Sequence, residues 1–124
     1  MSVTFAQMKE RVGRKLGVLA AGNSLSAEDA NLISERCRSL QKQLDELGIA
    51  QIDFDDGIDE LIDNIIVAMV AALLVDDFML GEPKRSQIAS EGALGLPVAS
   101  PAERQLRKIL APTRVSPPVK AEYY

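Results

Sequence analysis

The 124-residue sequence predicts an all-α protein, a small helical bundle of about four to five helices with an extended C-terminal tail. Apolar residues recur at helical i, i+3, i+4 spacing through most of the chain, and residue types typical of helix ends interrupt them. The alternating pattern of strands is nearly absent. We divide the chain into a helical body, residues 1–111, and an extended, proline-containing arm, residues 112–124. The composition, 47% hydrophobic but only 4% aromatic, predicts an aliphatic core.

Residues that cap or terminate helices define the bounds of the first two predicted helices. Thr4 and Gln7 have capping-box spacing and open a helix over 5–16, which Gly17 is placed to end. Ser26 opens a second helix, which ends at Gly48. Its apolar stripe is predicted to contain Ala30, Ile33, Cys37, Leu40, Leu44 and Leu47. The single cysteine is therefore interpreted as a small core residue, and an internal disulfide is excluded.

The most hydrophobic stretch, residues 58–80, predicts the core helix around which the others pack. Asp55 or Asp56 is placed to cap its start, and Gly81 followed by Pro83 to stop it. The uncharged run over 64–75 is twelve residues long, whereas a membrane span needs about 20. A buried helix is therefore expected here, and no membrane association.

The last third of the body predicts two more helices. A short one covers 84–92, and a longer one opens at Ser100, with Pro101 and Glu103 in favoured first-turn positions. From Pro112 onward, three prolines favour an extended or polyproline conformation. The arm residues expected to bind a portal protein or a neighbouring subunit are Arg114, Val115, Pro117, Pro118, Val119, Lys120, Tyr123 and Tyr124. Paired tyrosines are common anchors in binding surfaces.

The sequence predicts no catalytic, cofactor-binding or metal-binding residues. Without histidine, Ser-His-Asp and Cys-His nucleophile systems and histidine metal ligands are excluded. A cluster of four acids invites a calcium-loop interpretation: Asp53, Asp55, Asp56 and Asp59. Counted from Asp53, however, Gly57 stands fifth instead of sixth and Asn64 stands where glutamate is required. Turn-forming and helix-capping carboxylates are the preferred interpretation, and paired-carboxylate hydrolysis is the minor alternative.

Charge is distributed unevenly along the chain. Residues 1–83 carry 7 basic and 15 acidic side chains, a net charge of −8, whereas residues 84–124 carry 7 basic and 3 acidic ones, a net charge of +4. An acidic body argues against a protein that grips the phosphate backbone. The N-terminus lacks the apolar region of a signal peptide, so synthesis in the cytoplasm is expected.

Two short sequence segments, called phrases below, resemble sequences of a known family. Residues 14–22, RKLGVLAAG, and residues 24–30, SLSAEDA, are similar to phrases of the head-to-tail adaptors of tailed phages. The nearest resemblance is to the tail accessory factor, or packaged-DNA stabilisation protein, of P22-like podoviruses. The chain departs from that family where a tryptophan is common near the end of the second helix, since Asp45, Glu46 and Leu47 stand here. Residues 82–124 match no fixed motif of the family.

The resemblance implies a non-enzymatic virion protein, located at the head–tail junction and made in the host cytoplasm. Copies of it would form a ring, usually of twelve subunits, beneath the portal protein. The ring would extend the DNA channel, help retain packaged DNA until ejection, and provide a platform for a downstream tail or nozzle protein. Family members commonly reach the portal with a C-terminal extension.

Two further hypotheses accompany this resemblance. The acidic cluster over 53–59 is expected to face the channel, where it would repel DNA phosphates and let the genome pass without specific binding. The alternative function is a small helical nucleic-acid-associated regulator that uses the basic C-terminal third. That alternative predicts salt-sensitive DNA binding, which the adaptor does not require.

Overall fold

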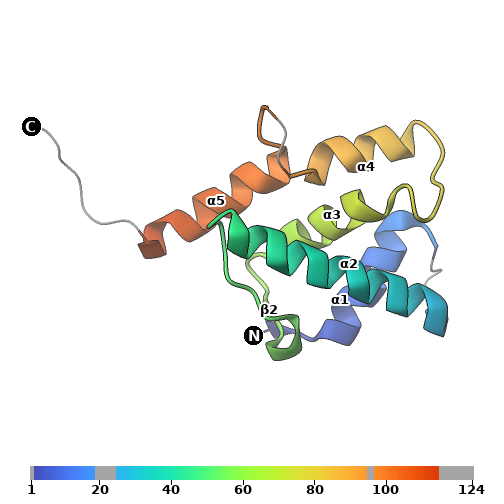
Figure 1. The fold of residues 1–124 in the computed structure, drawn as a ribbon, viewed down its shortest axis with the longest axis horizontal. Helices are drawn as coiled ribbons and strands as arrows, with labels where there is room; N and C mark the ends of the chain where they lie inside the picture. The colour runs from blue at the N-terminus through green and yellow to red at the C-terminus, as the bar shows by residue number, and fades with distance from the viewer. Residues whose placement is uncertain (1, 19–24, 95–96, 115–124) are drawn as a thin grey trace, which may run out of the picture.

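A computed structural model of the protein describes residues 2–18, 25–94 and 97–114. This part of the chain contains five α-helices: α1 (Phe5–Leu16), α2 (Ala27–Glu46), α3 (Asp63–Leu74), α4 (Lys84–Gly92) and α5 (Pro101–Arg114) (Figure 1). A single 3₁₀ turn, η1 (Phe54–Asp56), and two short strands, β1 (Ser2–Val3) and β2 (Ile58–Asp59), complete it. The prediction of an all-α bundle is confirmed.

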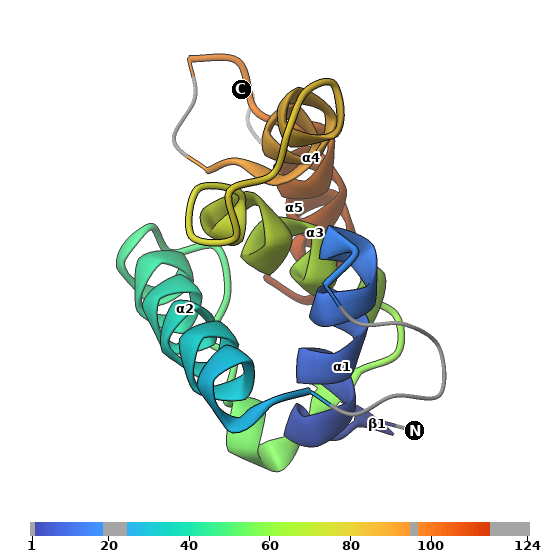
Figure 2. The same ribbon diagram turned by 90° about the vertical axis from the view of Figure 1, so that its right-hand side faces the viewer.

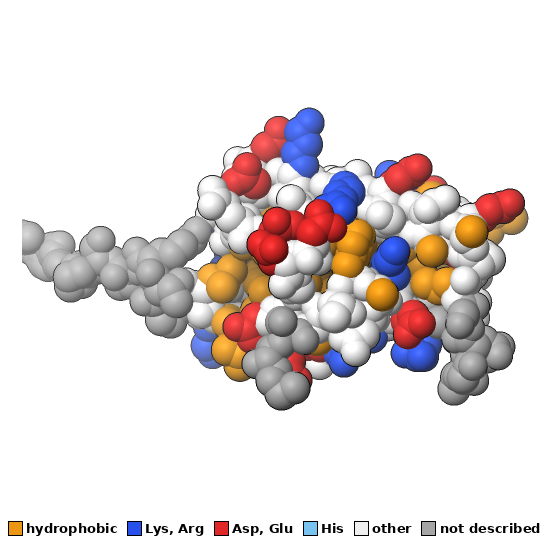
Figure 3. Space-filling model, turned by 90° about the horizontal axis from the view of Figure 1, so that it is seen from below, with side chains coloured by type: hydrophobic (Ala, Val, Ile, Leu, Met, Phe, Trp, Pro, Cys, Tyr) orange, Lys and Arg blue, Asp and Glu red, His pale blue; other side chains and the backbone are white. Residues whose placement is uncertain are grey.

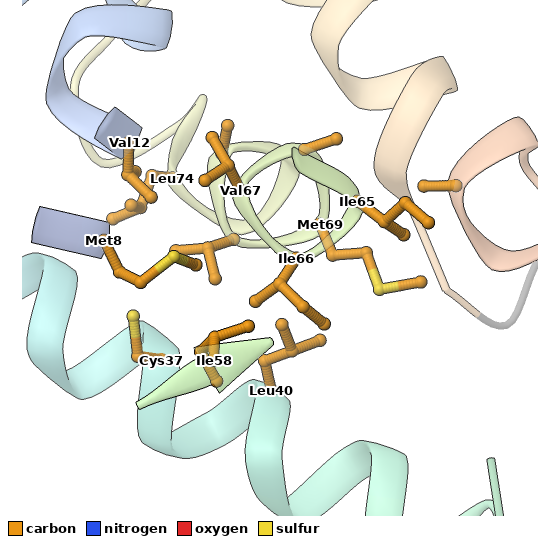
Figure 4. Packing of buried hydrophobic residues seen from close by; sticks show 14 of the residues in the cluster. Met8, Val12, Cys37, Leu40, Ile58, Ile65, Ile66, Val67, Met69 and Leu74 are labelled. Atoms are coloured by element: carbon orange, nitrogen blue, oxygen red, sulfur yellow. The ribbon is translucent and has the colours of Figure 1, made fainter. Parts of the chain in front are cut away.

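Helix α3 lies at the centre of the bundle, and the other four helices pack around it (Figure 2). Nine of its twelve residues are buried, so it has no solvent-facing stripe of the kind that a surface helix shows. Around α3, Met8 and Val12 of α1, Cys37 and Leu40 of α2, and Ile58 of β2 point into the same core (Figure 4). Burial of an aliphatic side chain of this kind stabilises the fold by about 1.5–3 kcal/mol.

The core helix begins five residues later than predicted. Ile58 pairs with Val3 in the antiparallel β1–β2 ladder, which holds the chain extended there. The Asp59 carboxylate then accepts a hydrogen bond from the Leu61 N–H at 2.9 Å. Such a side-chain turn competes with helix formation. The predicted capping by Asp55 or Asp56 is therefore wrong, and Ile62 stands at the N-cap without a side-chain hydrogen bond.

The core helix also ends earlier, at Leu74 instead of residue 80. Turns follow it, and Met79 adopts a left-handed backbone with φ 53°. The Leu80 N–H donates to the Val75 carbonyl at 3.1 Å and closes this turn. Phe78 and Leu80 thereby pack against the core. The predicted stop at Gly81 is wrong because packing of these side chains offsets the cost of about 1–2 kcal/mol for a left-handed non-glycine residue.

The first two helices follow their predicted signals closely. The Gln7 N–H donates to Thr4 Oγ1 at 3.2 Å and the Thr4 N–H to Gln7 Oε1 at 3.0 Å, so the capping box of α1 is confirmed. The Asp29 N–H donates to Ser26 Oγ at 3.2 Å and opens α2. The prediction that Leu47 belongs to the buried apolar stripe of α2 is wrong, because Leu47 is 52% exposed. The chain turns inward after it at Gly48, φ 71°, and Ile49 takes the buried position.

Helices α4 and α5 also begin where predicted. The Glu103 N–H donates to Ser100 Oγ at 3.3 Å, which confirms the cap of α5. Helix α5 runs to Arg114, so residues 112–114 are helical instead of extended as predicted. The φ that proline imposes is compatible with a helix, although its missing N–H and its ring cost a helix interior about 3 kcal/mol. The arm positions beyond it lie outside the described residues: Val115, Pro117, Pro118, Val119, Lys120, Tyr123 and Tyr124.

Within the described ranges no helix combines the length and the apolar character that crossing a bilayer requires.

Candidate functional site

The acidic cluster lies on η1, β2 and the turns beside them, and all four carboxylates are exposed. Asp53 caps η1 by accepting the Asp55 N–H at 3.0 Å, while Asp59 caps the turn before α3. Asp55 accepts a hydrogen bond from the Arg38 guanidinium at 2.9 Å, which lowers the pKa of its carboxyl. Asp53 and Asp59 therefore form turns, as the preferred interpretation expects. No group of three or more acidic or cysteine side chains in the described part of the chain could hold a metal ion.

Arg38 fixes this acidic loop to the first two helices. Besides the ion pair with Asp55, its guanidinium lies 5.0 Å from the centre of the Phe5 ring. The Phe5 ring in turn lies 5.5 Å from the ring of Phe54, the buried residue of η1. Cation–π and aromatic contacts of this kind add favourable electrostatic and packing interactions to the burial of Phe54. The loop is therefore held on the bundle by contacts that sequence spacing does not reveal.

Several charged side chains form ion pairs that connect different elements of the described chain. Their partners lie far away in the chain: Arg11 binds Asp63, Lys15 binds Glu91 at 2.8 Å, Arg36 binds Asp77 at 2.8 Å, and Arg85 binds Asp76. Sequence reasoning missed these pairs because it considers only neighbours three or four residues apart. Each of these basic side chains is neutralised by a carboxylate partner. The body therefore offers fewer free positive charges than its number of basic residues suggests.

A groove of about 580 Å³ lies over α3, between α1, α4 and α5. Its floor is apolar and includes Ile65, Val67 and Ala68. The basic residues at its edge are Arg11, Arg14 and Lys15. Two of them are engaged by Asp63 and Glu91, and Arg14 has a carboxylate of Glu10 at 3.9 Å. This groove is therefore poorly suited to gripping phosphate groups.

A second groove, of about 450 Å³, lies between the end of α2, the chain that follows it and α5; we call it the α5 groove. It is lined by Asp45, Gly48, Ile49, Ala50, Gln51, Ile52, Ile62 and Leu110. Three exposed hydrophobic residues adjoin lining residues in the sequence: Leu47 (52% exposed), Leu61 (73%) and Ile109 (36%). Hydrophobic side chains are visible at the end of the molecule where the chain continues beyond α5 (Figure 3). Apolar surface of this kind is typical of protein-binding sites.

The remaining candidate for chemistry, Cys37, is fully buried between α1, α2 and α3 (Figure 4). Burial raises the pKa of its thiol to about 12. A thiol in this environment is a poor nucleophile, because the thiolate is the reactive form. The structure thus agrees with the prediction that Cys37 is a core residue.

In comparisons with known proteins, no protein-family model, curated protein or solved structure matches this chain.

Proposed function

We propose that the protein is a structural head-to-tail adaptor of a tailed phage. Copies of it form a ring beneath the portal protein, extend the DNA channel, help retain packaged DNA and provide a platform for a downstream tail or nozzle protein. The observation that carries the proposal is the position of the two resembling phrases. The first includes the end of α1 at Leu16 and Gly17, and the second includes Ser26, the cap of α2. The described parts of the two phrases lie at the end of one helix and the start of the next, which supports the proposal; positions 19–24 lie outside the described residues.

The surface of the body supports an assembly role. Three of its exposed hydrophobic residues, Leu47, Leu61 and Ile109, adjoin lining residues of the α5 groove in the sequence. Several of its basic side chains are held in ion pairs between elements. The acidic cluster is exposed, and among the described side chains it has one arginine partner, Arg38, which binds Asp55. A negative surface repels DNA phosphates, so a channel that it lined would let the genome slide.

The test is the mass of the purified protein in solution, alone and mixed with purified portal rings of P22-like podoviruses. We expect copies that associate only weakly without portal, so that the average mass is low, and a complex of fixed ring stoichiometry with the portal. A portal from a phage of another tail type is the control. A protein that ignores every portal but binds DNA, with affinity falling steeply as salt is raised, would instead be the nucleic-acid-associated regulator.

A further inference from the structure

We propose that the α5 groove of one copy receives residues 115–124 of a neighbouring copy. This inference rests on the proposed ring-forming function and names the contact that joins its subunits. Three features carry it: the shape and chemistry of the groove, the chemistry of residues 115–124, and the position at which α5 ends.

The groove offers an apolar surface with two polar side chains at its edge. Ile52, Ile62 and Leu110 contribute aliphatic surface, and Asp45 and Gln51 contribute a carboxylate and an amide. Its volume of about 450 Å³ lies within the range of sites that enclose small ligands or several side chains. An occupant that fits must therefore be mainly apolar, with a positive charge and a few hydrogen-bonding groups.

Residues 115–124, VSPPVKAEYY, have that chemistry. Val115 and Val119 are aliphatic, Lys120 complements the Asp45 carboxylate, and the hydroxyls of Tyr123 and Tyr124 can hydrogen-bond with an amide such as that of Gln51. Tyrosine is enriched among the residues that dominate binding energy. The segment holds one basic and one acidic side chain, Lys120 and Glu122, so the charge complementarity is local, between Lys120 and the Asp45 carboxylate.

The position of the end of α5 favours the groove of a neighbour over that of the same chain. Helix α5 runs on from Leu110, which lines the groove, to Arg114, about 6 Å further along its axis. To enter its own groove, the chain would have to reverse at once. Pro117 and Pro118 oppose this reversal, since the residue before each proline is restricted to extended conformations. At about 3.1 Å per residue, ten residues in polyproline geometry reach about 30 Å, far enough to meet a second copy.

A contact of this kind is heterologous, because the arm of each copy occupies a different surface on the next. Heterologous contacts generate a closed ring when the rotation between copies is right, and an open filament otherwise. The arm-into-groove contact therefore supplies a geometry that a ring requires.

Disulfide trapping tests the inference with the full-length protein. We introduce Gln51→Cys in the groove and Ala121→Cys in the arm of one chain; the native Cys37 is fully buried and does not interfere. Under mild oxidation without portal, the double variant should form a ladder of covalent multimers that a reductant dissolves. An equimolar mixture of the two single variants should form heterodimers but no larger species. Ser90→Cys, at an exposed position of α4, replaces Gln51→Cys in the control, which should form no ladder.

Each other outcome overturns the inference. A monomer that has lost both introduced thiols to an internal disulfide would place the arm in its own groove. A yield no higher than that of the Ser90→Cys control would exclude the groove as the binding site. In the double variant, Ile52→Asp should reduce ladder formation at least tenfold without changing the circular dichroism, and an unchanged yield would contradict the proposal.

The trapping result and the portal result are independent. A chain that forms rings on the portal but no ladder retains the adaptor function and loses the arm-into-groove contact. A chain that forms the ladder but ignores portals retains the contact and loses the adaptor function.

Discussion

The Arg11–Asp63 ion pair joins α1 to the start of α3, and its two side chains differ sharply in burial. The Asp63 side chain is 8% exposed and the Arg11 side chain 42%. Without the arginine, the carboxylate would remain buried and lose its countercharge. Without the carboxylate, the guanidinium could turn to water. The cost of breaking the pair should therefore depend on which partner is removed.

We predict that Arg11→Met lowers the free energy of unfolding by about 2–3 kcal/mol and Asp63→Asn by only about 1 kcal/mol. Arg14→Met is the matched control on the same helix; its partner is an exposed glutamate at 3.9 Å, so its effect should stay within about 0.5 kcal/mol. Urea denaturation followed by circular dichroism measures all three. Equal losses for the first two variants would refute the asymmetry.

Cys37 allows a second test at the residue scale. Burial raises its thiol pKa from 9.0 to about 12, so at pH 8 its thiolate fraction is about 1,000-fold smaller than that of an ordinary cysteine. We predict correspondingly slower labelling of Cys37 by a thiol reagent in the native protein. The comparison is Ser90→Cys in a Cys37→Ala chain. The difference in rate should vanish in denaturant, and equal native rates would contradict the buried position.

The same pKa shift predicts how stability depends on pH. Because the folded-state pKa is raised, the contribution of the neutral thiol is fully present below pH 9 and is lost as pH rises toward 12. The difference in unfolding free energy between the native chain and Cys37→Ala should therefore shrink above pH 9. Equilibrium denaturation of both chains from pH 7 to 11 measures it, and a constant difference would oppose the assignment.

At the scale of elements, the last residue of α4, Gly92, lies close against the backbone of α3. A Cβ added at Gly92 would lie 2.2 Å from the Ala68 carbonyl oxygen and 2.6 Å from its carbonyl carbon. Both atoms belong to the backbone of α3 and cannot rotate away. Gly92 therefore sets how closely the two helices pack, and Ile88 of α4 is buried in the same core.

We predict that Gly92→Ala lowers the free energy of unfolding by about 1–3 kcal/mol, the range typical of overpacking. Intrinsic helix propensity alone would favour alanine by about 0.5–1 kcal/mol, so the sign of the change separates packing from propensity. Gly81→Ala is the control, since no atom lies within 4 Å of a Cβ there. A stabilised Gly92→Ala protein would show that the helices can move apart freely.

At the scale of the whole molecule, the body should fold without the arm. Among the residues whose burial is described, the buried cluster ends at Leu106, with Leu110 packed against it, and truncation after Arg114 keeps all of these residues. We predict an unchanged melting temperature and the loss of stoichiometric attachment to portal rings. Thermal unfolding and mass measurement check the two parts. Attachment at full stoichiometry by the truncated protein would refute a role for the arm.

The acidic cluster supports a separate prediction about DNA passage. Asp53→Asn, Asp56→Asn and Asp59→Asn together remove three charges but keep the side-chain oxygens that cap the turns. Asp55 is left intact because it binds Arg38. The triple variant should fold normally but alter DNA retention or slow genome ejection from assembled particles. Wild-type retention and ejection would exclude the channel-lining hypothesis.

The sequence by itself determined the features that depend on near neighbours. The Thr4–Gln7 capping box, the Ser26 and Ser100 caps and the bounds of α1 and α4 involve residues only a few positions apart, so their patterns can be recognised without a fold. Helical periodicity likewise determined that the chain is all-α and that its most apolar stretch is central.

The tertiary structure alone decided features that join distant residues. The start of α3 depends on the pairing of Val3 with Ile58, and its end on the packing of Phe78 and Leu80. The Arg11–Asp63 pair spans 52 positions, and the α5 groove combines the end of α2 with α5. Such contacts form only when the chain closes long loops to bury apolar surface. Their energy depends on geometry that local spacing does not specify.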